Sequence, residues 1–433
     1  MHPADDTVAK AAPLSPHPLR VSVLDEAHAR PFHAMAAPRR LLHFAFVTSP
    51  EQARSDRAAV AALCSSCGVP APGDHAKHHR VNLGDVWLRW EQHTEFTTYT
   101  LEFDGPDSLH QATMTLAAPM VSTPQPGPLL VSVDLRITTG ALTEQLGALF
   151  DPSALALANL EGGDAAAATD FKADADGFVR ILLVNQRLTD HRLGALAQRL
   201  LELETYRMLA LIALPEAQRL EPFVRHIEQE LPDITRGIME GQGVGSNQEL
   251  LDRLISLAAQ LEASATSALY RFGASRAYHD IVRGRLEAIN ETPYPGYSTF
   301  SAFLSRRLSP AMRTCTTLED RQSNLAQRLA RAAQLLTARV EIELEQQNRD
   351  LLFTMNKRTD LQFRLQKTVE TLSVAAVSYY IIAVLAYVFK GLQAVLPLNA
   401  DVATAIAAPL VVVGVGFIVL RIHKLHGRET APD

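Results

Sequence analysis

Two long apolar stretches near the carboxyl end constrain this chain more than any other feature. They span residues 372–389 and 402–420 and contain no charged side chain. A helix rises about 1.5 Å per residue, so each stretch is long enough to cross roughly 30 Å of hydrocarbon. The connector at 390–401 is too short for a domain. The sequence therefore predicts a transmembrane hairpin; the alternative is a pair of core helices in a soluble protein.

The charges beside these stretches predict their orientation. Basic residues flank the hairpin on both sides: Lys357, Arg358, Arg364, Lys367, Arg421, Lys424 and Arg428. The connector has one Lys and one Asp. Positive residues stay on the cytoplasmic side, so we expect two spans with both termini in the cytoplasm. The amino terminus lacks the pattern of a signal peptide, so export of the bulk is not expected.

The composition excludes some classes of protein. Three cysteines among 433 residues are too few for a disulfide framework, which fits a reducing compartment. A net charge of −6 argues against a dedicated nucleic-acid binder. No phosphate-binding glycine loop, dinucleotide fingerprint, HExxH or GxSxG motif is present. We expect no cofactor, and an enzyme is less expected than a binding or transport protein.

The amino-terminal part predicts an α+β domain with a mainly antiparallel sheet at 19–185, after a disordered segment at 1–18. Aromatic and β-branched residues at 86–103 predict a strand hairpin, and 41–47, 129–137 and 179–184 predict further strands. A helix is expected at 52–67. The Gly- and Asp-rich stretch 162–177 predicts a flexible loop.

Beyond this domain the chain is expected to be helical, with a helical region at 189–310 and a stalk at 311–371. Thr189 is placed to cap a helix that ends near Leu214, because Pro215 follows. Asn247 is placed to cap a second helix that reaches Glu291. A third helix is expected from Thr317 through the first span, before the second span and a cytoplasmic tail at 421–433.

Apolar residues repeat along the predicted stalk with steps of mostly 4, 4 and 3. They are Leu325, Leu329, Ala332, Leu336, Val340, Leu344, Leu351, Met355, Leu365 and Val369. An eleven-residue repeat is typical of a nearly straight or slightly right-handed coil. The stripe is expected either to pack against the helix at 247–291 within one subunit or to bundle stalks of several subunits. Self-association through the stalk and the spans is therefore expected.

Two strand segments carry clusters of polar residues. Glu26, His28 and Arg30 project to one side of an extended chain and could bind an anion or a metal. Arg89, Glu91, His93 and Glu95 share one face of the next segment, opposite Leu88, Trp90 and Phe96. Two carboxylates beside a histidine could hold a divalent cation or serve acid–base chemistry. The alternative in both places is a structural role, as strand-end hydrogen bonds or cross-strand ion pairs.

Two further groups of residues are weaker candidates. Cys64, Cys67, His75, His78 and His79 include a CxxC and an HxxxH, a formal set of zinc ligands, but the spacing is shorter than in a zinc finger. Ser373, Tyr380 and Tyr387 recur every seven residues along the first span. They could line an aqueous path or permit close helix packing.

Several segments resemble the blocks of a known bacterial family. They are LDEAHARPF, WLRWEQHTEFTTYT, LYRFGASRAYHDIVRGRL, FLSRRLSPAMRTC, EQQNRDLLFTMNKR and LQKTVETLSVAAVSYY. The chain is identified as a member of the uncharacterised membrane-anchored proteins called domain of unknown function 3422. This resemblance covers nearly the whole chain and implies a Gram-negative inner-membrane protein without implying an activity or a ligand. The CxxC is not part of the family pattern.

The order of the predicted elements is also similar to that of CorA-type metal-ion transporters. Those proteins place a cytoplasmic α/β domain before a long stalk and a two-span hairpin, and they form pentamers. Their Gly-Met-Asn signature would fall near 387–392, where this chain has YVFKGL, and Lys390 would repel cations there. The sequence thus leaves two functions open, an oligomeric ion channel or transporter and a non-conducting, membrane-tethered scaffold or regulator.

Overall fold

The computed structural model of the 433-residue chain describes residues 17–20, 24, 32–121, 123–140, 142, 146–147, 149–240, 244–392 and 399–426. The predicted disorder at 1–18 falls almost wholly outside these residues, as do most of the tail at 421–433 and the candidates Glu26, His28 and Arg30. By its contacts the chain divides into two compact units, Met1–Glu240 with Asp252–Ala332 and Gly241–Leu251 with Ala333–Asp433. The domain bounds expected from the sequence stay a prediction.

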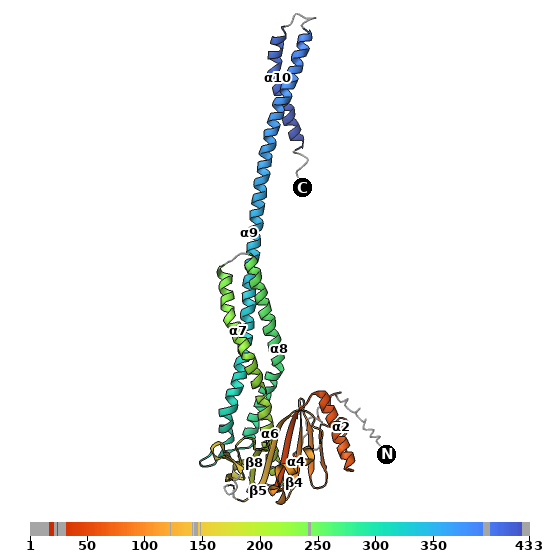
Figure 1. Ribbon diagram of the computed structural model, residues 1–433, viewed down its shortest axis with the longest axis vertical. Helices are drawn as coiled ribbons and strands as arrows, with labels where there is room; N and C mark the ends of the chain where they lie inside the picture. Colours follow the sequence, from red (N-terminus) through yellow and green to blue (C-terminus); the bar gives the residue numbers. More distant parts are fainter. Residues whose placement is uncertain are drawn as a thin grey trace, which may run out of the picture. The chain divides into compact units, whose positions relative to one another are not determined.

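The first unit contains a nine-stranded sheet in the order β2-β3-β4-β1-β5-β8-β7-β6-β9 (Figure 1). Every pair of neighbouring strands is antiparallel except β5 and β8, which confirms the predicted α+β class. The strands are β1 (Arg39–Val47), β2 (His78–Asn82), β3 (Trp87–Gln92), β4 (Phe96–Asp104), β5 (Leu129–Thr139), β6 (Ala156–Leu160), β7 (Ala165–Thr169), β8 (Val179–Asn185) and β9 (Thr292–Pro293).

Helices interrupt and follow the strands. They are α2 (Pro50–Ser66), α3 (Asp107–His110), α4 (Thr113–Val121), the 3₁₀ turns η1 (Pro152–Ala154) and η2 (Glu161–Gly163), α6 (Asp190–Leu211), α7 (Ala213–Glu240), α8 (Val244–Ala288), α9 (Phe300–Leu392) and α10 (Ala400–His426). Ser49 and Gln52 form a reciprocal capping box at the start of α2. Thr189 caps α6, as predicted.

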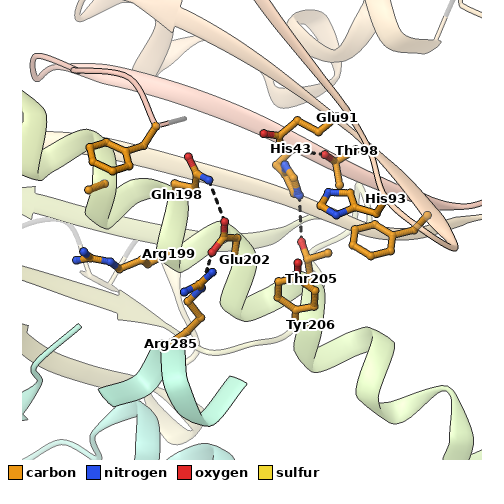
Figure 2. Close-up of a pocket in the computed structure, with 13 residues that line it drawn as sticks. His43, Glu91, His93, Thr98, Gln198, Arg199, Glu202, Thr205, Tyr206 and Arg285 are labelled. Carbon is orange, nitrogen blue, oxygen red and sulfur yellow. Dashed lines mark hydrogen bonds and ion pairs between the residues drawn. The ribbon is translucent and has the colours of Figure 1, made fainter. Parts of the chain in front are cut away.

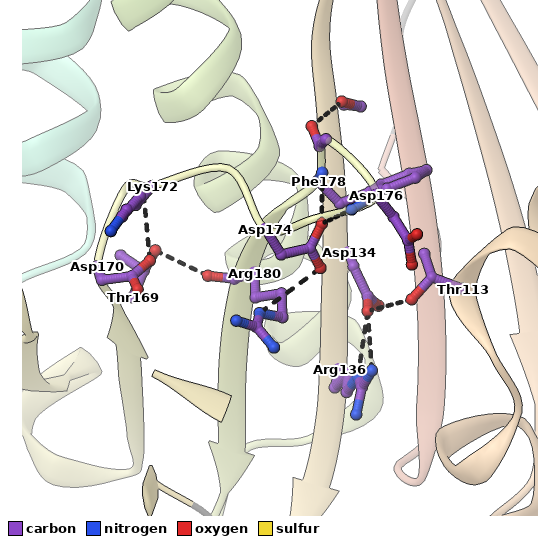
Figure 3. A network of polar contacts seen from close by, with 12 residues as sticks. Thr113, Asp134, Arg136, Thr169, Asp170, Lys172, Asp174, Asp176, Phe178 and Arg180 are labelled. Atoms are coloured by element: carbon purple, nitrogen blue, oxygen red, sulfur yellow. Dashed lines mark hydrogen bonds and ion pairs between the residues drawn. The ribbon is translucent and has the colours of Figure 1, made fainter. Parts of the chain in front are cut away.

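The loop expected at 162–177 was wrong, because Ala165–Thr169 forms the buried strand β7. Alternate alanines of β7 pack into apolar clusters on the two faces of the sheet, so small side chains suit this inner strand. The turn that follows is closed by Asp174, whose Oδ1 accepts hydrogen bonds from the backbone N–H groups of Asp176 and Phe178 at 3.0 and 2.9 Å (Figure 3).

Two expectations about the long helices also need correction. Asn247 does not cap α8, since it lies inside that helix and its Nδ2 donates to Glu343 Oε2 at 2.9 Å. Helix α9 begins at Phe300 rather than near Thr317 and continues through Pro310. Its first turns are tied to the sheet, because Phe300 and Phe303 are buried in the same apolar cluster as Leu135 and Ile181.

The apolar face of the sheet that carries Trp90 is closed by α2. Val60 and Cys64 of α2 pack with Trp90 and Tyr99 in one cluster. Asp56 ties the helix to the strands, since it accepts from Trp90 Nε1 at 2.7 Å and from the Tyr99 hydroxyl at 2.5 Å. Burial raises the pKa of Asp56, and the two hydrogen bonds oppose that shift.

A buried ion pair holds the segment after β4 against the sheet. The Arg40 guanidinium makes a bidentate pair with Asp134, at 2.8 Å to each oxygen, and both side chains are fully buried. Arg40 also donates to the carbonyls of Ser108 and Gln111 and to Thr113 Oγ1. All five hydrogen bonds are charge-assisted, so Arg40 attaches this segment firmly to the sheet.

We predict that Arg40→Met lowers the free energy of unfolding by about 3 kcal/mol, because the buried Asp134 would keep only Arg136 as a cation and the carbonyls of Ser108 and Gln111 would lose their donor. The measurement is denaturant unfolding of the full chain in detergent, followed by fluorescence. Both tryptophans, Trp87 and Trp90, lie in β3 and report on this sheet. The control Arg349→Met removes the exposed pair with Glu345 and should change little. Equal loss in both variants would contradict this account of Arg40.

Candidate functional site

On the face of the sheet opposite Trp90, the part formed by β1, β3 and β4 is polar although it is buried. Cross-strand register places Arg89 opposite Thr100, Thr100 opposite His43, and Glu91 opposite Thr98. All five side chains are less than a tenth exposed. Burying polar groups is unfavourable unless each finds a hydrogen-bond partner, so the partners on this face decide what it can do.

His43 is fixed by two threonines. Its Nε2 lies 3.0 Å from Thr205 Oγ1 of α6, and its Nδ1 lies 2.9 Å from Thr100 Oγ1. Thr205 donates its hydroxyl proton to the Leu201 carbonyl at 2.9 Å, so it accepts from His43. The hydrogen-bond network therefore assigns a neutral imidazole protonated at Nε2. Burial, with smaller contributions from Arg89 and His93, lowers the pKa of His43 to about 3.

A cavity of about 410 Å³ opens beside His43, between the sheet and helix α6 (Figure 2). Its aromatic wall consists of Phe32, His93, Phe96 and Tyr206, and the remaining lining residues are His43, Glu91, Thr98, Ala195, Gln198, Arg199, Glu202, Thr205 and Arg285. The rings of His93 and Phe96 stack with centroids 4.0 Å apart. This size and mixture of aromatic and polar groups suit a small organic ligand.

Gly194 explains why α6 can lie so close to the segment that brings Phe32 to the cavity. A Cβ atom at this position would lie 1.8 Å from the carbonyl oxygen of His33. Only glycine permits this contact between the helix and the chain. The backbone N–H of Met35 then donates to the carbonyl of Asp190 at 2.9 Å, which fixes the segment on the helix.

Most charges of the cavity are neutralised by a partner. Arg285 Nε pairs with Glu202 Oε2 at 2.5 Å, and Glu202 Oε1 accepts from Gln198 at 2.9 Å. Arg199 pairs with Glu161 at 2.7 Å. These contacts hold the α6 side of the cavity and the end of α8 in place. In each ion pair the charge of the arginine is balanced by that of its glutamate.

Glu91 is the exception. It is 7% exposed, its Oε2 accepts one long hydrogen bond of 3.4 Å from Thr98, and its Oε1 has no hydrogen-bond partner within the described residues. Among those residues no cation lies within ion-pair distance of its carboxylate. A buried carboxylate without a cation costs several kcal/mol. The cavity thus presents a buried carboxylate beside aromatic rings, with one oxygen that has no partner among the described residues.

The residues predicted to share a face with Glu91 separate in the structure. His93 lines the same cavity. Arg89 lies beside it and donates to Gln198 Oε1 at 3.2 Å. The turn at 93–95 changes the alternation, so that Phe96 faces the cavity rather than the Trp90 side, and the prediction for Phe96 was wrong. Glu95 turns to α8, where Arg271 donates to both of its oxygens at 3.2 and 2.7 Å.

The zinc candidates are not assembled into a site. Cys64 is buried in α2, Cys67 is exposed, and His79 Nε2 lies 2.9 Å from the Pro70 carbonyl. Within the described residues, no group of three or more His, Cys, Asp and Glu side chains could hold a metal ion. The metal prediction therefore has no geometric support.

The span candidates lie on an exposed side of α9. Tyr380 and Tyr387 are 70% and 79% exposed, and the Ser373 hydroxyl donates to the Val369 carbonyl at 2.9 Å. Helices α9 and α10 each contain a segment long and apolar enough to cross a membrane. A pore or packing role for these three residues stays a prediction.

Sequence reasoning missed the helical half of the cavity. Gln198, Glu202 and Thr205 follow one another at steps of four and three on α6, among leucines, so a polar patch on an otherwise apolar helix was the available signal. Arg285, which pairs with Glu202, falls within LYRFGASRAYHDIVRGRL, one of the segments on which the family resemblance rests.

A family model described as "Protein of unknown function (DUF3422)" matches residues 15–426. The chain belongs to this family. The match covers the strands, the cavity and both apolar helices, and it confirms the resemblance found in the sequence. No curated protein and no solved structure is similar enough to count as a match. The architectural similarity to CorA-type transporters therefore has no support beyond the order of the elements.

The neutral state of His43 makes the unit sensitive to acid. The pKa of His43 is about 3 in the folded state and 6.5 in the unfolded state. Between these two values the unfolded chain binds a proton at His43 and the folded chain does not. Stability should be full above pH 6.5 and fall as the pH decreases towards 3, by about 2 kcal/mol at pH 5 from this group alone. Denaturant unfolding of wild type and His43→Gln at pH 7.5 and pH 5 measures this pH-dependent loss of unfolding free energy. An unchanged pH dependence in the variant would contradict this role for His43.

Proposed function

We propose that this protein is a membrane-tethered binding protein whose α+β unit takes a small organic cation into the cavity beside Glu91. The observation that carries the proposal is the buried Glu91 carboxylate, which faces the cavity with one oxygen unpartnered. An ammonium group supplies the missing positive charge and hydrogen bonds. The aromatic wall suits a ligand whose cation is attached to an apolar body.

The apolar ends of α9 and α10 support the tether. Both are compatible with membrane anchoring, and the basic residues around them favour the cytoplasmic side for the α+β unit. Together with the family resemblance, this supports the bacterial inner membrane as the location. The protein is then a receptor or regulator that holds its binding unit close to the bilayer.

Ion conduction is less well supported than a tether. Lys390 lies in the last turn of α9, at the end of the first proposed span. A positive charge at the mouth of a pore repels cations. In our proposal the spans anchor the protein and the ligand binds in the α+β unit.

We predict that benzylammonium raises the melting temperature of the full chain and that benzyl alcohol, its uncharged counterpart, does not. Glu91→Gln should abolish this shift, whereas Glu51→Gln, which changes an exposed residue of α2, should leave it unchanged. The measurement is a thermal shift assay in detergent. Equal shifts for wild type and Glu91→Gln would refute the assignment of Glu91.

The stability of Glu91→Gln without ligand distinguishes a ligand-binding role of Glu91 from a structural role. Without ligand, Glu91→Gln should be as stable as wild type or more stable, because it removes an uncompensated buried charge at constant shape. If Glu91 instead has a structural role, the free energy of unfolding of Glu91→Gln should be about 1–3 kcal/mol lower than that of wild type.

The tether and its orientation are tested by labelling with a maleimide that cannot cross the membrane. Lys390→Cys should react in intact spheroplasts, and Asp350→Cys should react only after permeabilisation. The full chain should also stay with the membrane pellet after an alkaline carbonate wash. Release of the wild-type chain into the supernatant would exclude two stable spans.

A further inference from the structure

A second cavity, of about 240 Å³, lies between the turn after β7 and the helices α6 and α9. Its charged lining residues are Lys172, Arg207, Arg307 and Asp170, and the remaining ones are apolar, among them leucines of α6 and α9. It shares no lining residue with the cavity beside Glu91. The two cavities are therefore separate sites.

Two arginines of this second cavity are held by aromatic rings. The rings of Phe171 and Phe303 stack on each other with centroids 5.1 Å apart. The Arg307 Cζ lies 4.0 Å from the centroid of Phe303, and the Arg207 Cζ lies 5.4 Å from that of Phe171. A guanidinium that rests on a ring face keeps the N–H groups at its edge free. Stacking thus positions both cations without using their donors.

The backbone at Phe171 places its ring in this stack. Its φ is 54°, in the left-handed region that residues other than glycine rarely adopt. The turn around it is fixed by side chains, because Thr169 Oγ1 accepts from the N–H of Phe171 and Asp170 Oδ1 accepts from the N–H of Lys172, each at 3.1 Å (Figure 3). Strained conformations of this kind gather at ligand sites, where the surrounding structure holds them.

The charges around the second cavity do not balance. Glu204 pairs with the Nε and Nη2 groups of Arg207, which leaves Nη1 of Arg207 without a partner among the described residues. The carboxylate of Asp170 accepts backbone N–H groups with both of its oxygens. Within the part of the chain that the structure describes, neither Lys172 nor Arg307 forms an ion pair. Three cations therefore stand against two carboxylates, and one positive charge is left over.

We infer that this second cavity binds a small organic carboxylate, with its anionic group on Arg307 and Lys172 and its apolar body against the leucines of α6 and α9. A carboxylate supplies the single negative charge that the cavity lacks. The edge of a guanidinium matches its two oxygens, so Arg307 can donate to both at once. A phosphate dianion would bring surplus negative charge close to Asp170 and has no apolar group to place against the leucines.

Fluorine NMR of the full chain in detergent tests this inference with 4-fluorobenzoate as the probe. The broadening of the probe signal with added protein gives its dissociation constant. The matched control is 4-fluorobenzamide, which has nearly the same shape and no charge. We expect the carboxylate to bind and the amide not to bind. Equal broadening of the two probes, or no binding of the carboxylate, would overturn the inference.

Two adjacent arginines of α9 distinguish this site from a general attraction by positive charge. Arg307→Gln should weaken the binding of 4-fluorobenzoate by on the order of tenfold or more, because it removes the cation and its paired donors. The control is Arg306→Gln, since the Arg306 side chain donates to Ser298 Oγ and to the Ala302 carbonyl, neither of which lines the cavity. It should leave the dissociation constant unchanged.

Arg307→Lys gives a finer test of the role of the guanidinium. It keeps the positive charge and loses the planar pair of donors, so its affinity should lie between those of wild type and Arg307→Gln. Both arginines are exposed, and each variant should melt close to the wild-type temperature without probe. Unchanged affinity in Arg307→Gln, or an equal loss in Arg306→Gln, would contradict the assignment of this site.

Discussion

The burial of a polar half-face of the sheet determines the chemistry of the α+β unit. Strand alternation sends Trp90 and Leu88 to one side, where α2 covers them, and sends Arg89 and Glu91 to the other. Because α6 closes over that second side, every polar group there must be satisfied by the protein or by something it binds. His43, Arg89 and Glu202 find protein partners, whereas Glu91 has one long hydrogen bond from Thr98 and, among the described residues, no partner for its Oε1. This difference identifies the cavity as the candidate site.

The long helices impose a second constraint. Helix α9 begins among the buried aromatic residues beside the sheet and ends in a stretch that can cross a membrane. Its sequence therefore has to satisfy three environments in succession: a protein core, water and lipid. The stripe that is buried at Leu325 and exposed at Leu351 reflects this change.

Short-range sequence patterns correctly predicted those elements of the fold that depend on neighbouring residues alone. The hairpin of β3 and β4, the Thr189 cap and the two apolar helices follow from alternation, capping chemistry and length. Strand β7 was missed because alanine has little intrinsic preference for strands, and its assignment depends on neighbours on both sides. Strand β9 could not be predicted, since it is a two-residue segment that pairs with a strand far away in the sequence.

The candidate site was predicted only in its strand half. Glu91 and His93 were identified from alternation, but Glu95 was separated from them by the turn and by Arg271 of α8. Gln198, Glu202 and Arg285 come from helices that the sequence does not place against this face.

The most direct test of the central claim is a structure of the full chain with 4-bromobenzylammonium, located by the anomalous signal of its bromine. The account predicts a bromine peak within the cavity and an ammonium nitrogen about 2.7–2.9 Å from a carboxylate oxygen of Glu91. A ligand bound elsewhere, or a Glu91 carboxylate paired with a protein cation in that structure, would contradict it.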